Sequence, residues 1–230
     1  MKKSYLFIFL TLIIIAVFFA VKNHSKDEIS AVSQNNPPIV QENISQDQNA
    51  NDTQNQNNIA PSGFQVPLDR ASQRVTRKPF GIYITPATSP VQPEKFQGYH
   101  TGTDFEIFSE ELNADVPARA VCSGKLLLKK YASGYGGVAV EFCELDKNPI
   151  TVVYGHLKLS SISTDIGENI NAGDIIGILG ANKSVETNGE RKHLHLGFHK
   201  GNAVNILGYV GKQSDLSNWL NPCLYVCAGK

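Results

Sequence analysis

The sequence predicts an all-β fold, a compact antiparallel β-sheet or sandwich domain within residues 64–230. Three observations lead to this class. Short β-branched and apolar runs such as Val138–Leu145 and Ile150–Leu157 are typical of strands. Glycine-rich turn signals separate these runs, most clearly at Ser133–Gly137. Finally, Lys192–His199 alternates polar and apolar residues, and a period of two indicates a half-buried strand.

The composition becomes globular from about Phe64, and the core of the domain is expected at about residues 80–205. About 150 ordered residues are enough to bury a core. Only Ser214–Trp219 has a helical pattern, with Ser214 as a candidate N-cap. Further strands are expected, in chain order, at Gly81–Thr85, Thr103–Ile107, Val116–Val121, Gly124–Tyr131 and Ile175–Leu179.

Residues 1–22 are expected to form a membrane anchor or signal sequence. Lys2 and Lys3 precede an uncharged apolar run of about the length of a short membrane-spanning helix. Cleavage after Ala20 would place bulky Phe18 where a small residue is needed, which favours an uncleaved transmembrane helix over a secretory signal. The two lysines should stay in the cytoplasm, so the C-terminal domain should lie outside.

Residues 23–63 are expected to be a disordered linker. Between residues 31 and 60, 14 of 30 residues are Asn or Gln and none is aromatic. Such a segment has too little apolar surface to offset the entropy lost on ordering. We therefore expect the linker to act as a tether between the membrane and the domain.

Charge and cysteine content limit the partners and the compartment of the chain. The 21 basic and 21 acidic residues balance, which gives no electrostatic reason to expect a nucleic acid partner. Four cysteines outside the membrane suggest disulfides, with three possible connectivities. Cys122 and Cys143 lie nearly equidistant from the turn at Ser133–Gly136, which favours Cys122–Cys143 and leaves Cys223–Cys227. Cysteine ligation of zinc is the rival interpretation, but no Cys-x-x-Cys spacing occurs.

His193 and His195 are the central candidate site residues. On a strand, residues two apart point to the same face, roughly 6 to 7 Å apart. One imidazole could therefore bind a metal while the other handles a proton. Leu194, Leu196 and Phe198 should point the opposite way, into a core. The alternative is an exposed strand face that carries histidines by chance, because short motifs have many false positives.

His100 and Asp104 are candidate partners of His195. The glycine and threonines around them argue against a helix, so the two side chains should converge across a turn that leads into a strand. Together with His195 they make two imidazoles and one carboxylate, which are ordinary zinc ligands. Three protein ligands leave a fourth position for water, as in catalytic zinc sites. Zinc lowers the pKa of that water to about 7 and polarises a carbonyl.

His156 ends the predicted strand Ile150–Leu157. A neutral imidazole titrates near the working pH, so His156 and His193 suit general-base and oxyanion-side roles. The helical His-Glu-x-x-His motif is absent. Each histidine alone is also explained as a strand-end residue with a satisfied hydrogen bond.

In order and spacing, these blocks resemble the lysostaphin- and LytM-type zinc metalloendopeptidases. The resemblance covers about residues 81–204 and implies the duplicated hybrid motif fold, a Zn²⁺ cofactor and cleavage of peptides in bacterial peptidoglycan. It also implies that His100, Asp104 and His195 bind the metal and that His156 and His193 are catalytic. The matching segments are His100–Asp104, Tyr154–Leu157, Gly173–Gly180 and His193–His195.

Two positions depart from the pattern of this family. Gly155 stands where alanine is often seen, and Gly197 stands where many members carry glutamate. Neither is expected to touch a ligand, although Gly197 could alter the wall of the cleft. His199 shares the face of His195 but matches no ligand of the family.

The leading expectation is a membrane-tethered zinc endopeptidase that hydrolyses peptidoglycan stem peptides or cross-bridges during cell-wall remodelling. It would work in the bacterial cell envelope with its domain extracytoplasmic, or be secreted if the N-terminal segment is cleaved. The alternative is a catalytically inactive domain of the same fold that binds and activates another cell-wall hydrolase. Such relatives typically lose zinc ligands, and this chain keeps them. A structural zinc in a wall-binding module would need four protein ligands, which the sequence does not readily supply.

Overall fold

The computed structural model describes residues 63–227. The expected membrane anchor at residues 1–22 and almost all of the expected linker at 23–63 lie outside this range. Within it, no helix is long and apolar enough to cross a membrane. The described part is mainly β-structure with short helical turns, which confirms the predicted fold class of the domain.

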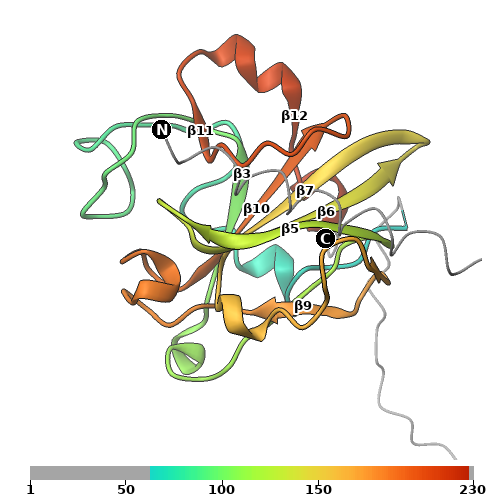
Figure 1. Cartoon of the computed structure of the whole chain (residues 1–230). Helices are drawn as coiled ribbons and strands as arrows, with labels where there is room; N and C mark the ends of the chain where they lie inside the picture. Colours follow the sequence, from blue (N-terminus) through green and yellow to red (C-terminus); the bar gives the residue numbers. More distant parts are fainter. Residues whose placement is uncertain (1–62, 228–230) are drawn as a thin grey trace, which may run out of the picture. The chain divides into compact units, whose positions relative to one another are not determined.

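The largest sheet has seven antiparallel strands and contains the histidine strand β10 (Figure 1). Six strands follow the order β12-β10-β7-β6-β5-β8, and β3 pairs with β10 beside this path. The bounds of the seven strands are β3 Gly102–Glu106, β5 Gly124–Ala132, β6 Gly136–Leu145, β7 Asn148–Leu157, β8 Asn169–Ile170, β10 His193–Lys200 and β12 Trp219–Leu220.

Two smaller sheets complete the domain. One has the order β1-β2-β11, with β1 Tyr83–Ile84, β2 Gly98–His100 and β11 Tyr209–Val210, and the other pairs β4 Pro117–Arg119 with β9 Ile175–Ile178. Each strand expected from the sequence has a counterpart in the structure. The unpredicted strands β2, β8, β11 and β12 have two or three residues each, which is too short to show a period.

The helical segments are short. Residues Gln213–Asn218 form the 3₁₀-helix η5 where the sequence predicts a helix from Ser214. Lys212 is the N-cap, so the assignment of Ser214 to that position is wrong. Because Trp219 is already extended and pairs with His199, the helix stops at the start of β12. The other segments are η1 Ala71–Gln73, η2 Ser109–Glu111, η3 Leu159–Ser161, η4 Val185–Thr187 and α1 Cys223–Val226.

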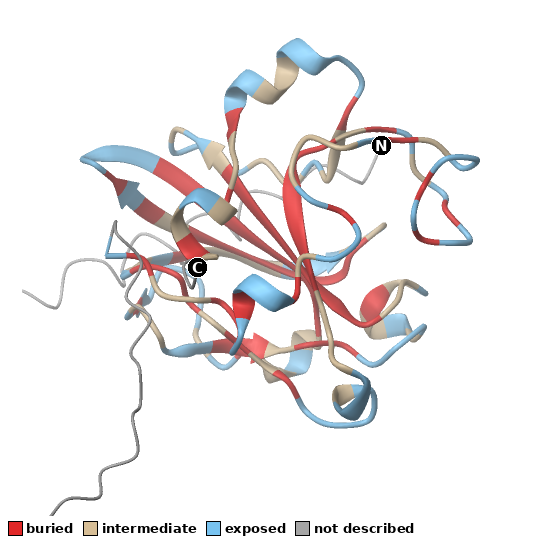
Figure 2. Ribbon diagram, turned by 180° about the vertical axis from the view of Figure 1, so that it is seen from behind, coloured by how far each residue is buried: buried red, intermediate tan, exposed pale blue. Residues whose placement is uncertain are grey.

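The main core combines the large sheet with the β4–β9 pair. Leu194, Leu196 and Phe198 are completely buried in it, which confirms the predicted inward face of β10. Ala118 of β4 and Ile176 of β9 belong to the same cluster. Burial is concentrated along the strands of the large sheet (Figure 2), and β10 is buried from His193 to Phe198.

The segment before β1 is docked along β3. The Arg74 guanidinium is buried and donates to both carboxylate oxygens of Glu111 at 2.7 Å. The Glu106 N–H donates to the Arg74 carbonyl at 2.9 Å, and the Asp104 N–H donates to the Lys78 carbonyl at 3.0 Å. A buried bidentate pair fixes geometry more strongly than a surface pair. The segment therefore holds β3 and its aspartate in place.

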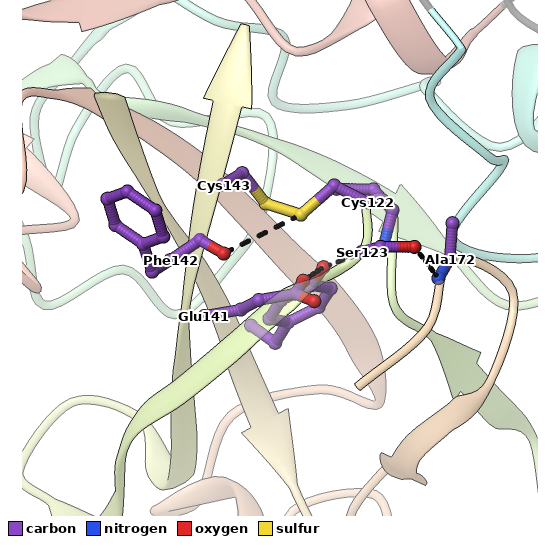
Figure 3. The surroundings of a disulfide bond; sticks show 8 residues. Cys122, Ser123, Glu141, Phe142, Cys143 and Ala172 are labelled. Carbon is purple, nitrogen blue, oxygen red and sulfur yellow. Dashed lines mark hydrogen bonds between the residues drawn. A yellow bond between two sulfur atoms is a disulfide. The ribbon is translucent and has the colours of Figure 1, made fainter. Parts of the chain in front are cut away.

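All four cysteines are paired as predicted. Cys122–Cys143 has a Cα–Cα distance of 6.1 Å, and Cys223–Cys227 has one of 4.5 Å. Figure 3 shows Cys143 on β6 joined to Cys122 just before β5, as the hairpin around Ser133–Gly136 requires. Glu141 lies close enough to Cys122 and Cys143 to make a metal-binding group, but both sulfurs are used in the disulfide. The cysteine-zinc interpretation is therefore wrong.

Glu141 is a buried carboxyl group whose protonation should affect stability. Its Oε2 accepts a hydrogen bond from the Tyr154 hydroxyl at 2.6 Å, while its Oε1 has no partner. Burial raises the pKa of Glu141 to about 8. The unfolded chain releases this proton near pH 4.5, so the contribution of Glu141 to the free energy of unfolding should fall as the pH rises from about 4.5 to 8 and then level off.

We expect Glu141→Gln to flatten this pH dependence, because the amide has no proton to lose. The free energy of unfolding, measured by denaturant titration from pH 4.5 to 9, should decline less steeply for the variant than for the wild type. Glu144→Gln, an exposed change on the same strand, is the matched control and should keep the wild-type slope. Parallel curves for the wild type and Glu141→Gln would contradict the assignment.

Candidate active site

The register of β10 brings together residues that are far apart in the sequence. His195 lies opposite Asp104 on β3 and opposite Gly155 on β7. His156 follows Gly155, and His100 ends β2 two residues before β3 begins. All five predicted site residues therefore meet around one strand. His100 and Asp104 converge across a turn, as the sequence predicts.

Three of these side chains present ligand atoms to one point. His100 Nε2 lies 3.0 Å from His195 Nδ1 and 3.3 Å from Asp104 Oδ1. His195 Nδ1 lies 3.2 Å from Asp104 Oδ1. Tetrahedral zinc with bonds of about 2.0 to 2.2 Å holds its ligand atoms about 3.3 to 3.5 Å apart. The three atoms thus form a triangle of the right size for one face of such a site, and they fit the metal that the sequence predicts.

Neighbouring groups orient these ligand atoms. The carbonyl of Pro79 lies 3.2 Å from His100 Nδ1, and a hydrogen bond from that nitrogen leaves the lone pair on Nε2. Asp104 Oδ2 accepts from Arg191 Nη2 at 2.8 Å, which leaves Oδ1 facing the two histidines. A metal-binding histidine or carboxylate usually has such a fixed outer partner.

Two of the three candidate ligands, Asp104 and His195, are unprotonated near neutral pH. Burial lowers the pKa of His195 to about 4, although the hydrogen bond to Asp104 opposes the shift. Burial alone would raise the pKa of Asp104, but His193, His100 and Arg191 hold it well below its usual value. The carboxylate of Asp104 and the neutral imidazole of His195 are the protonation forms that bind a metal ion.

His193 and His156 lie beside this triangle. Both are buried, and their ring centroids are 4.3 Å apart. His193 Nδ1 lies 2.8 Å from the Arg191 carbonyl, and its Nε2 lies 3.3 Å from Asp104 Oδ2. Burial, together with the charge of His193, holds the pKa of His156 well below its usual value. The alternative of an exposed histidine face on β10 is therefore wrong, because other segments cover that face.

Asp104, His156, His193 and His195 line a cavity of about 350 Å³. Its wall combines aromatic and aliphatic groups with the polar groups of the site, which is the usual character of a ligand pocket. The residues around it are Lys78, Phe96, Gln97, Asp104, Ser133, Gly134, Tyr135, His156, Glu190, Arg191, His193, His195, Ile206, Leu207, Gly208 and Tyr209.

Sequence reasoning missed several of these residues. Arg191 lies two residues before His193, and its guanidinium bridges Asp104 and Glu106. The strand period that links His193 to His195 could have pointed to it. Tyr209 and Lys78 come from outside the resembling region, and the Lys78 ammonium donates to the Tyr209 hydroxyl at 3.1 Å. No local pattern signals that pair.

A side chain at either of the two positions that depart from the family pattern would lie against His195. A β-carbon on Gly155 would lie 3.2 Å from His195 Cβ. A β-carbon on Gly197 would lie 3.5 Å from His195 Nε2 and 3.4 Å from the Trp219 ring. Gly197 does not line the cavity. It faces Trp219, which also packs edge-on against His199.

The fold and the site define a β-sheet domain with a candidate metal centre in a cleft. Residues 98–206 match the family model described as peptidase family M23. The matched segment is a domain of this family. The match covers the predicted site residues and ends before Tyr209.

Similar proteins are found among curated sequences and solved structures. Endolysin 2638A of Staphylococcus phage 2638A is 39% identical over 99 residues, which are 43% of this chain and 18% of the endolysin. The chain thus spans less than a fifth of that relative. The catalytic domain of lysostaphin from Staphylococcus simulans is 22% identical over 63% of this chain and 85% of that domain, with a TM-score of 0.42. LytU is 23% identical over 65% of this chain and 81% of that structure, with a TM-score of 0.43.

Proposed function

We propose that the chain is a zinc metalloendopeptidase that hydrolyses peptide bonds in peptidoglycan stem peptides or cross-bridges. The observation that carries this proposal is the triangle formed by the ligand atoms of His100, Asp104 and His195, with two further histidines beside it in one cavity. Membership of a peptidase family supports the reaction class. The similarity to a phage endolysin supports a substrate in the cell wall.

Each side chain of the site has a role in this proposal. His100, Asp104 and His195 would hold Zn²⁺, which when bound polarises a carbonyl and lowers the pKa of a water to about 7. His193 accepts the proton of the attacking water at Nε2, and Asp104 Oδ2 at 3.3 Å stabilises the imidazolium that forms. His156, kept neutral by burial, donates a hydrogen bond on the oxyanion side.

Incubation of the purified chain with purified peptidoglycan tests the proposal. We expect soluble fragments with new amino and carboxyl ends, identified by mass spectrometry. A chelator should abolish their release and added Zn²⁺ should restore it. Intact peptidoglycan in the presence of a zinc-loaded chain would contradict the proposal.

The same experiment separates the enzyme from an inactive activator. An activator would release nothing alone, yet would increase the fragments released by a second wall hydrolase added to the mixture. The retained ligand triangle favours the enzyme, because an activator has no need of a metal with an open position.

We also propose that the domain works in the bacterial cell envelope, on the outer side of the membrane, with residues 1–22 as its anchor. Two disulfides between all four cysteines support an oxidising compartment. Membrane fractionation followed by protease treatment of intact cells tests this location. The domain should co-sediment with membranes and be digested from outside, whereas a protease-resistant domain would contradict it.

A further inference from the structure

Tyr135 is a buried residue of the cavity whose hydroxyl has no partner. The side chain is 7% exposed, and its hydroxyl is shielded from water without a hydrogen bond. The ring lies edge-on to the candidate ligand His195, with centroids 5.3 Å apart, and its centroid is 5.4 Å from that of His156. The phenol ring thus packs against both a candidate metal ligand and a candidate catalytic histidine. A buried donor without an acceptor is rare, because its lost hydration is not recovered.

Gly155 makes this position of the ring possible. A β-carbon on Gly155 would lie 2.4 Å from Tyr135 Cδ1 and 2.5 Å from Tyr135 Cε1, which is far inside van der Waals contact. An alanine at Gly155, the residue that the sequence resemblance leads one to expect, would therefore push the ring away from His195. In this chain the Tyr135 ring occupies the space that the methyl group of an alanine at position 155 would fill.

The backbone around Tyr135 holds the ring in place. The Gly134 N–H donates to Asn188 Oδ1 at 2.6 Å, and the Tyr135 N–H donates to the Ala132 carbonyl at 3.0 Å. On the other side, a β-carbon on Gly208 would lie 3.0 Å from the Tyr135 hydroxyl. Gly208 also lines the cavity, so the absence of a side chain there leaves room in front of the hydroxyl.

We propose that the Tyr135 hydroxyl donates a hydrogen bond to the oxygen of the scissile peptide as that oxygen becomes negatively charged. The inference rests on the proposed peptidase function and assigns Tyr135 a catalytic role in addition to the five site residues. A hydrogen-bond donor that is held in a site shielded from water and has no other partner is well placed to stabilise an oxyanion.

The step in which the hydroxyl acts is the attack of water on the carbonyl carbon. The water oxygen bonds to that carbon while one proton of the water passes to His193, and the π electron pair of the carbonyl moves onto its oxygen. Tyr135 keeps its proton and shares it with this oxygen. When the C–N bond breaks, the carbonyl re-forms and the proton held by His193 passes to the leaving amine.

Three variants of the full chain test the role of the hydroxyl. Tyr135→Phe removes the donor, and Gly208→Ala crowds it with a methyl group. Tyr225→Phe is the matched control, because this phenol packs against Phe64 and Phe198 away from the cavity. For each variant and the wild type, zinc content, thermal unfolding and the kinetics of peptidoglycan peptide cleavage are measured. The affinity for a phosphinate pseudo-dipeptide of alanine is measured on the same samples. The anionic phosphinyl oxygens of this probe imitate the tetrahedral centre.

We expect Tyr135→Phe to lower kcat about 10²- to 10³-fold, with zinc content and KM unchanged. Binding of the phosphinate should weaken by a similar factor, because only the tetrahedral oxygen needs the donor. Gly208→Ala should show the same pattern more weakly, and Tyr225→Phe should match the wild type. A purely structural role would instead lower thermal stability or zinc content.

Wild-type kcat and phosphinate affinity in Tyr135→Phe would overturn the inference, and so would a loss explained by released zinc. If the wild type binds the phosphinate but cleaves no peptide, the proposed function is wrong. That outcome differs from failure of the inference alone, in which the wild type cleaves peptides and Tyr135→Phe matches it in kcat and phosphinate affinity.

Discussion

Replacing His195 by alanine should remove both the metal and the activity. His195 Nδ1 is one corner of the triangle with His100 and Asp104, and two protein ligands are too few for a stable zinc site. We expect about one zinc per wild-type chain and almost none in His195→Ala or His100→Ala. Elemental analysis of the purified variants, with turnover measured on the same samples, checks this result.

His193→Ala and His156→Ala change candidate catalytic histidines instead of candidate metal ligands. Neither residue is a corner of the triangle, so both variants should keep zinc and lose turnover by about 10²- to 10⁴-fold. The pH profile of the wild type should show a limb at about 7, where a zinc-activated water titrates. The assignment is reversed if His193→Ala loses zinc while His195→Ala keeps it. Wild-type turnover in both catalytic variants would exclude their proposed role.

Removal of the Cys122–Cys143 disulfide should have the largest effect on stability. The bridge closes a loop with a sequence separation of 21, and the chain-entropy model gives about 3 kcal/mol for a loop of this size. Both sulfurs are buried within the main core, so replacement of both residues by alanine also loses packing. We expect the double variant to melt about 6 to 12 °C lower than the wild type.

The Cys223–Cys227 bridge is the internal control. Its sequence separation is only 4, for which the same model gives about 2 kcal/mol. The corresponding double alanine variant should therefore lose less stability, with both variants measured by thermal unfolding under non-reducing conditions. Equal losses would show that packing around the sulfurs, rather than loop closure, decides the contribution of each bridge.

The sequence predicted which side chains meet in the candidate site because its key signals are local. Alternation along β10 placed His193 and His195 on one face, and the symmetry of the hairpin around Ser133–Gly136 paired Cys122 with Cys143. The first inference depends on the fixed side-chain period of two in strands, and the second depends on the equal rise per residue of two paired strands. The burial of the histidine face could not be predicted in the same way, because it depends on segments such as Gly208 and Tyr209 that arrive from elsewhere in the chain.

The outer partners of the site escaped prediction for the same reason. Pro79 contributes only a backbone carbonyl to His100, and no residue type signals such a contact. Arg191 is recognisable as a ligand-orienting residue only when β3 and β10 are paired. The position of Tyr135 depends on Gly155, because any side chain there would collide with the Tyr135 ring. A sequence pattern does not reveal such a contact.

The docked segment before β1 has a consequence for where the catalytic unit begins. The family match starts at residue 98, yet Arg74, Lys78 and Pro79 already hold Glu106, Asp104 and His100 through backbone carbonyls. A fragment cut to the matched span would lose these three contacts, and with them the outer supports of two candidate metal ligands. The smallest autonomous peptidase should therefore start upstream of Arg74, so that homology boundaries and folding boundaries differ in this chain.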